Sequence, residues 1–224
     1  TRGSGVVAKL GTDGQVFTSA GAGLSQGFEA AAGGGFIKLA ASTISAQSAG
    51  VSFDGYFTSA YDRYVVFGSE LYGSEAHDLW FRTRESDADV STSAYCNTNA
   101  YLKTTNAVSM SVSTTDSASC DTNSFANKWK TQGSGANEAP ASSTIGYRCN
   151  FTIYSPLNTT TRHKLMSYEY HYAGQFSDTT LFQRCFGDGF FDQVATGATA
   201  LSGLTIFPSA GNLSGKFTLY GYIV

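Results

Sequence analysis

The sequence predicts an all-β protein: a jelly-roll-like β-sandwich of about ten strands preceded by a short extended N-terminal arm. The first observation is composition, because only 14% of the 224 residues are charged, 14% are aromatic, and 25 Gly stand against 3 Pro. The second is that no long stretch spaces its apolar residues for one helical face. The third is that short apolar runs with a period of two recur between turn-forming residues.

The arm is expected at residues 1–35, which are rich in Gly and Ala. Asp13-Gly14 predicts a tight turn, and Gly33–Gly35 a hinge into the sandwich domain at 36–224. So few apolar residues cannot order a segment alone, so the arm is expected to wrap against copies of itself, although a plain linker is the alternative. The residues expected to hold such an oligomerisation arm are Val7, Val16, Phe17 and Phe28.

The expected strands follow in chain order. They are Phe36–Ala41, Val51–Phe53, Tyr61–Tyr72, Asp78–Arg84, Val108–Val112, Tyr147–Tyr154, Arg162–Tyr172, Leu181–Phe186, Leu204–Phe207 and Phe217–Val224. Val65–Phe67 is apolar on both faces, which predicts a central strand. The last strand places Phe217, Leu219 and Ile223 on one face, so the C-terminal end is expected in the core. Ser86–Pro140 is otherwise expected to form long loops.

Charge and hydropathy exclude several classes of partner. The net charge of −3 supplies no basic excess for nucleic acid. No apolar run approaches the roughly 18 residues of a membrane span. The N-terminus lacks Met and an apolar signal core, as expected of a trimmed or partial chain.

The cysteines predict neither a metal site nor a cofactor. Cys96, Cys120, Cys149 and Cys185 lie far apart, without the close spacing of a zinc site. Cys149 alternates with apolar neighbours and is expected to be buried. Cys96 and Cys120 flank a polar stretch; sequence leaves open whether they pair, because a disulfide requires a geometry that it does not supply.

No catalytic motif is present, so no catalytic residue is assigned. His163 and His171 share a strand face with Ser167 and Glu169, which is the ordinary pattern of a solvent-facing strand surface. The acidic pairs are Asp87 with Asp89 and Asp188 with Asp192. Each pair could serve a glycosidase or a calcium ion, but both lie in Gly- and Ser-rich stretches where Asp commonly forms turns.

Aromatic residues among Ser, Thr and Asn give the stronger signal. The candidates for receptor binding are Tyr95, Tyr101, Phe125 and Trp129. Such side chains in polar loops stack on sugar rings. The alternative is that they fill a core beneath a long loop, and the sequence does not choose between the two.

Four stretches resemble a known family. LGTDGQVFTSAGAGLSQGFEAAAGGG (10–35) is similar to the linker that precedes the distal domain in tail-fibre and related virion proteins of tailed bacteriophages. Phe17 stands where that pattern usually has Leu. The segments Ser52–Phe67, Leu79–Ser86 and Leu204–Val224 resemble parts of the family's terminal β-sandwich. Ser86–Pro140 shows no family pattern.

The resemblance implies a non-enzymatic phage structural protein, located on the virion as a surface appendage or on the capsid exterior. It implies a homotrimer, contact with other virion proteins through residues 1–35, and attachment to a host-surface glycan or protein. Two alternatives stay open. One is a capsid decoration or head-fibre protein, and the other is a tail spike that degrades polysaccharide.

Overall fold

The computed structural model describes residues 15–18, 27–30, 35–104, 110–113, 127–130, 146–160, 163–176, 179–192 and 199–223. Every regular element among them is a strand, so the all-β prediction is confirmed. The chain divides into two units, residues 1–35 and Phe36–Ile223.

The N-terminal unit contains a two-stranded antiparallel sheet of β1 (Gln15–Thr18) and β2 (Gly27–Ala30). The backbone register pairs Phe17 with Phe28 and Val16 with Glu29. The segment is therefore more regular than the extended arm that its composition predicts. Val7 and the Asp13-Gly14 turn lie outside the described residues.

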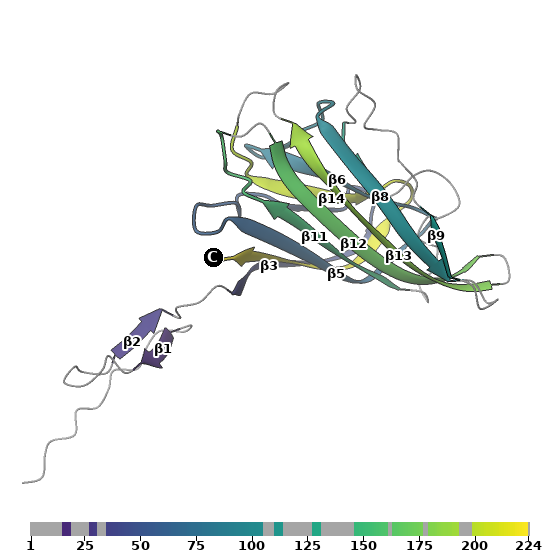
Figure 1. Ribbon diagram of the computed structural model, residues 1–224, viewed down its shortest axis with the longest axis horizontal. Helices are drawn as coiled ribbons and strands as arrows, with labels where there is room; N and C mark the ends of the chain where they lie inside the picture. Colours follow the sequence, from purple (N-terminus) through teal and green to yellow (C-terminus); the bar gives the residue numbers. More distant parts are fainter. Residues whose placement is uncertain are drawn as a thin grey trace, which may run out of the picture. The chain divides into compact units, whose positions relative to one another are not determined.

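The second unit holds strands β3 to β15, which form two antiparallel sheets (Figure 1). Their bounds are β3 Phe36–Gln47, β4 Val51–Phe53, β5 Arg63–Gly73, β6 Leu79–Glu85, β7 Ala88–Asp89, β8 Tyr95–Thr104, β9 Met110–Ser113, β10 Trp129–Lys130, β11 Tyr147–Tyr154, β12 His163–Phe176, β13 Thr179–Asp192, β14 Gly203–Pro208 and β15 Leu213–Tyr222.

The order of these strands is that of a jelly roll. The eight-stranded sheet runs β3-β15-β5-β11-β12-β13-β8-β9, and the five-stranded sheet runs β10-β6-β14-β4 with β7 beside β6. Within them β3, β4, β5 and β6 pair antiparallel with β15, β14, β11 and β10 in turn. First-with-last nesting across two sheets is the jelly-roll arrangement, so that prediction is confirmed.

Two insertions extend one sheet beyond this framework. β8 and β9 arise between β6 and β10, and β12 and β13 arise between β11 and β14. β12 pairs with β11, β13 with β12, and β8 with β13. The long inserted strands therefore lie side by side at one end of the curled sheet (Figure 1).

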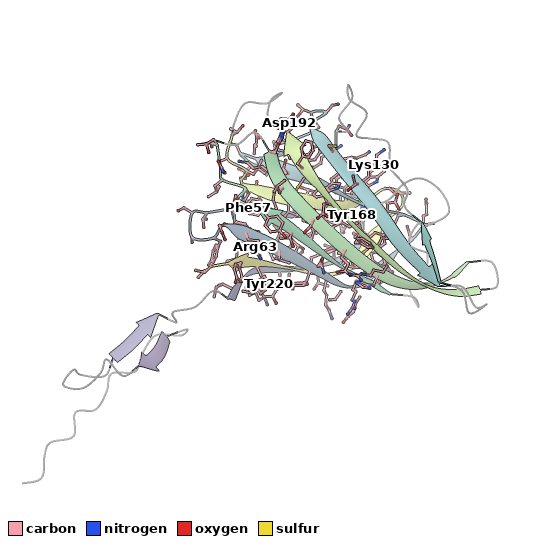
Figure 2. The ribbon with its side chains drawn as sticks, in the orientation of Figure 1. Phe57, Arg63, Lys130, Tyr168, Asp192 and Tyr220 are labelled. Atoms are coloured by element: carbon pink, nitrogen blue, oxygen red, sulfur yellow. The ribbon has the colours of Figure 1, made fainter. Side chains whose placement is uncertain are left out.

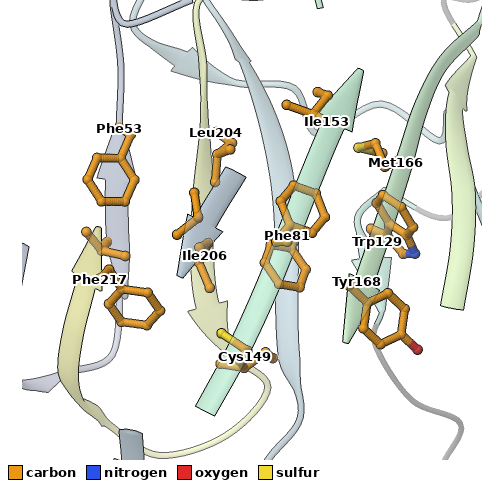
Figure 3. Close-up of a cluster of buried hydrophobic side chains, with 14 of the residues drawn as sticks. Phe53, Phe81, Trp129, Cys149, Ile153, Met166, Tyr168, Leu204, Ile206 and Phe217 are labelled. Carbon is orange, nitrogen blue, oxygen red and sulfur yellow. The ribbon is translucent and has the colours of Figure 1, made fainter. Parts of the chain in front are cut away.

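The core lies between the sheets, as Figure 3 shows. Phe81 of β6 stacks on Phe151 of β11, with ring centroids 4.1 Å apart and planes 10° apart. Trp129 of β10 meets Phe151 edge-on at 5.3 Å and Tyr168 of β12 at 6.0 Å. These rings join strands of both sheets, so the sandwich is closed by aromatic contacts across it.

Period-two alternation predicts most inward-facing residues. Tyr147, Cys149, Phe151 and Ile153 are all buried, as expected. On β15, Phe217 and Leu219 are buried, and Thr218 between them is half-buried.

Several details of the strand predictions are wrong. Ile223 is 42% exposed and follows the end of β15 at Tyr222, so the core does not extend to it. β5 is central in its sheet, as predicted, but Phe67 is 43% exposed, so its apolar outer face is not fully buried. β8 occupies a region that was expected to be a loop, because its sequence does not alternate polar and apolar residues. Pairing with β13 on one side and β9 on the other stabilises it as a strand.

Removing the central ring should weaken the fold strongly. We expect Phe151→Ala to lower the free energy of unfolding by roughly 3–5 kcal/mol, because it leaves a cavity beneath Phe81 and Trp129. Urea unfolding followed by tryptophan fluorescence measures this loss. Leu165→Ala is the matched control: Leu165 is 60% exposed, so its loss should stay within about 0.5 kcal/mol. Equal losses in the two variants would contradict this description of the core.

Candidate binding face

Two of the aromatic candidates for receptor binding lie inside the protein. Tyr95 and Trp129 are both 0% exposed. The Tyr95 hydroxyl donates to the carbonyl oxygen of Val90 at 2.8 Å and accepts from the Thr83 backbone N–H at 2.9 Å. Burial raises the pKa of Tyr95 to about 12, so the hydroxyl stays protonated. Tyr95 and Trp129 therefore take the other role that the sequence allowed, packing in a core.

The side chains of the other two candidates, Tyr101 and Phe125, lie outside the described part of the structure. The backbone of Tyr101 pairs with Cys185 of β13, and its side chain is outside the described part. Phe125 lies outside the described residues altogether.

Exposed aromatic side chains gather instead on the outer face of the eight-stranded sheet. Cross-strand register aligns Thr218 with Phe67, Phe67 with Asn150, Asn150 with Glu169, and Glu169 with Phe186. Directly paired residues project to the same side of a sheet. The row therefore carries side chains of β15, β5, β11, β12 and β13 toward solvent.

A shallow hollow of about 610 Å³ lies along this row and the next one. It is lined by Phe67, Gly68, Ser69, Arg148, Cys149, Asn150, Glu169, His171 and Arg184. The register places His171 between Arg148 and Arg184. The hollow thus combines an aromatic wall with charged and amide groups.

A β-bulge borders this hollow. Between Gly68 and Leu71, β5 has two residues, Ser69 and Glu70, where β11 has only Arg148. Glu70 there has a φ of 54°, in the left-handed region that few side chains adopt. Such bulges bend a strand and re-aim its side chains, and this one lies where Ser69 and Arg148 meet the hollow.

Glu169 is held by two neighbours, Arg184 and His171. The Nε of Arg184 donates to its Oε1, and the Nε2 of His171 lies 2.8 Å from the same oxygen. Partial burial raises the pKa of Glu169, but the hydrogen bond and charge of Arg184, with help from His171, outweigh it and leave that pKa below its usual range. Glu169 is therefore a carboxylate at neutral pH.

Arg148 differs from Arg184 in having no carboxylate beside it. Its side chain is exposed, and within the ranges that the structure describes no acidic side chain comes within ion-pair distance of it. The hollow therefore holds one compensated and one uncompensated guanidinium.

An aromatic group continues the face beyond Phe67. It consists of Phe36, Phe67, Tyr220 and Tyr222 with the Arg63 guanidinium. Phe67 lies 5.6 Å from Tyr220 and 6.4 Å from Phe36, ring centre to ring centre. The Arg63 guanidinium lies 4.8 Å from the Tyr222 ring centre. Figure 2 labels Arg63 and Tyr220 on this part of the face. The group joins the hollow to edge strand β3.

The Asp188–Asp192 pair does not form a glycosidase site. Both residues lie within strand β13, not in a loop as the sequence suggested. Four residues along a strand span roughly 13 Å, whereas paired glycosidase carboxyls lie about 5–9.5 Å apart. Asp192 instead lies 3.7 Å from the Nδ1 of His163.

Asp87 and Asp89 belong to a tight hairpin. Ser86 and Asp87 have φ values of 48° and 70° and connect β6 to β7 in a two-residue turn, as a type I′ hairpin requires. Asp89 accepts a hydrogen bond from Arg84 at 2.6 Å, and Arg84 also donates to the carbonyl of Asp87. The Asp89 carboxylate is thus paired within the hairpin, whereas the Asp87 carboxyl hydrogen-bonds with Asp54, which raises the pKa of Asp87.

The structure also places the Ser167, Glu169 and His171 group and three of the four cysteines. Ser167 stands four residues from His171 on β12, roughly 13 Å along the strand, so Ser167, Glu169 and His171 make no triad. Cys149 and Cys185 are buried free thiols, while Cys96 is disulfide-bonded. Cys120, its suggested partner, lies outside the described residues.

The described ranges contain neither a metal-binding cluster nor a membrane-spanning helix. No three His, Cys, Asp or Glu side chains there gather closely enough to hold a metal ion. The same ranges contain no helix of the length and hydropathy that crossing a bilayer requires.

Comparison of the chain with models of known protein families, with curated proteins and with solved structures gave no match. The support for a binding face therefore comes from the chain's own residues. The sequence marked Glu169 and His171 as solvent-facing, but Phe67, Arg148, Arg184 and Phe186 were missed. Alternation within each strand could have placed them outward; strand order was needed to bring them together.

The Glu169 ion pairs give a pH-dependent prediction. Because folding lowers the pKa of Glu169, its contribution to stability is present above about 4.5, the usual value, and is lost as pH falls through the lower folded-state value. We expect Glu169→Gln to lower the free energy of unfolding at pH 7 by up to about 1 kcal/mol, so that the variant unfolds at a lower urea concentration than the parent. At pH 2 the two proteins should unfold at the same urea concentration.

The control is Glu70→Gln, which removes a carboxylate whose pair with Lys216 is largely exposed. It should change stability little at either pH. A Glu169→Gln difference that persists undiminished at pH 2 would show that Glu169 acts through packing and not through its charge.

Proposed function

We propose that this chain is a structural protein of a bacteriophage virion, a fibre or spike domain displayed on the particle, which attaches to the host surface. The observation that carries the proposal is the outer face of the eight-stranded sheet, where exposed aromatic rings adjoin a hollow of paired charges. Resemblance of residues 10–35 and of the closing strands to phage appendages supports it.

The face suits a glycan in particular. Sugar rings present apolar C–H faces to aromatic side chains and hydroxyls to charged or amide groups. Phe67 and Phe186, 43% and 37% exposed, supply two rings in one cross-strand row, with Asn150 and Glu169 between them. The row thus places two polar side chains between two aromatic rings.

Copies of the chain assemble through residues 1–35 in this proposal, as a homotrimer that also contacts other virion proteins. The β1–β2 pair supports the idea, because an isolated two-stranded sheet is marginal in water and gains stability when other copies cover it. Several displayed faces then bind together, so weak individual contacts give high avidity.

A capsid decoration or head-fibre protein is the second candidate. The same β1–β2 segment favours it, since an anchoring segment serves the capsid exterior as well as a tail. An enzymatic role has less support, because the Asp188–Asp192 spacing does not suit a glycosidase and the Asp89 carboxylate is paired with Arg84.

Attachment is tested with the full-length protein carrying a fluorescent label. It should bind host cells and their isolated envelope polysaccharide, and Phe67→Ala with Phe186→Ala should weaken binding tenfold or more, at about 1 kcal/mol for each ring. Tyr56→Ala removes an aromatic ring of similar exposure, 38%, outside the face and should leave binding unchanged. Equal affinity of all variants would reject the face as the attachment site.

Location is tested by immunogold labelling of purified phage particles. Label on tail fibres supports the fibre assignment, label on the capsid supports the decoration protein, and unlabelled particles reject both.

Assembly is tested by light scattering of the purified chain. We expect the parent to have the mass of a trimer. Phe17→Ser with Phe28→Ser should reduce it to one copy while thermal unfolding of the sandwich is unchanged, because the two positions pair in the β1–β2 register. Gln15→Ser is the control. A parent that is monomeric would contradict the proposal.

A further inference from the structure

We propose that the hollow selects polysaccharides that carry carboxylates, with Arg148 binding the acid group of a uronic-acid residue. This inference rests on the proposed function and adds the ligand's chemical class. It follows from the charge in the hollow, from the polar groups around Arg148, and from the extent of the aromatic face.

The charge in the hollow is not balanced. Glu169 is paired with Arg184 and His171, so its carboxylate charge is already compensated. Arg148 lines the same hollow with no carboxylate next to it among the described residues. A guanidinium binds a carboxylate through two parallel N–H···O bonds, so an acidic sugar supplies the partner that the described residues do not.

The positions around Arg148 suit the rest of a sugar ring. Asn150 is two residues along β11, on the same face, and Ser69 lines the hollow across the bulge of β5. An amide and a hydroxyl each donate and accept hydrogen bonds, as sugar hydroxyls require. Phe67 in the same lining offers a ring face.

The face is too long for one sugar. The hollow begins at Arg184 on β13, and the aromatic group ends at Phe36 on β3. Between them lie β12, β11, β5 and β15, so the path crosses five strand spacings. At about 4.8 Å for each spacing this is roughly 24 Å. Such a path accommodates several linked sugars, with the acid group in the hollow and neighbouring rings on Phe67, Tyr220 and Phe36.

The experiment compares acidic polysaccharides with their own uncharged forms. Polygalacturonate, polymannuronate and polyglucuronate are immobilised, each beside a sample whose carboxyls have been reduced to alcohols. Binding of the full-length protein is followed by biolayer interferometry. We expect at least one acidic polymer to bind roughly ten to a hundred times more tightly than its reduced form, as for a hydrogen-bonded charge pair.

Variants of one residue then locate the effect. Arg148→Gln should abolish the preference for the acidic form, and Arg148→Lys should keep part of it, because lysine retains the charge without the paired N–H groups. Lys128→Gln is the control. It removes the same charge beside Trp80 of the other sheet and should leave the preference intact. Melting temperatures of all variants should match, since Arg148 is exposed.

The outcomes separate this inference from attachment itself. Equal binding to acidic and reduced polymers overturns the inference and leaves glycan attachment standing. Failure to bind any of the acidic polymers also overturns it, and the host-cell assay then decides attachment independently. A preference that survives in Arg148→Gln assigns the charge recognition to another residue and rejects the role of Arg148.

Discussion

The contact between Phe81 and Phe151 is the constraint on which the rest of the domain depends. The two rings come from different sheets and stack with their centroids 4.1 Å apart. Trp129 packs edge-on against Phe151. Because this layer must stay dry, each strand that crosses it commits alternate residues to the interior. The residues between them are left outward, so the composition of the outer face is set by the need to seal the inner one.

The insertions explain why the hollow lies where it does. β5 and β11 belong to the jelly roll, whereas β12 and β13 form an added hairpin that continues the same sheet. Phe67 and Arg148 come from the first pair, and Glu169 and Arg184 from the second. The candidate site therefore spans the junction between the framework and an addition to it. A change in the inserted hairpin alters half of the site without disturbing the nested strand pairs.

Strict alternation made parts of the fold predictable. Tyr147–Tyr154 was predicted to the residue, because four apolar side chains alternate with polar ones. β8 was missed because its sequence YCNTNAYLKT mixes polar residues onto both faces. Tyr95 and Trp129 were ambiguous because polar neighbours suggest exposure, while burial depends on partners distant in sequence, such as Phe191 for Tyr95 and Tyr168 for Trp129. Strand order is non-local, so no local pattern could place Arg148 and Glu169 in the lining of one hollow.

The sulfur chemistry of the domain bears on how long it keeps its native disulfide state in oxidising solution. Cys149 lies in the core with its pKa raised by burial to about 12, so its thiolate fraction at neutral pH is on the order of 10⁻⁵. Exchange with a disulfide requires a thiolate that can reach the bond. The bridge at Cys96 and the free sulfur of Cys149 therefore coexist in one molecule without reshuffling. The domain can therefore remain in oxidising solution without disulfide exchange at Cys149.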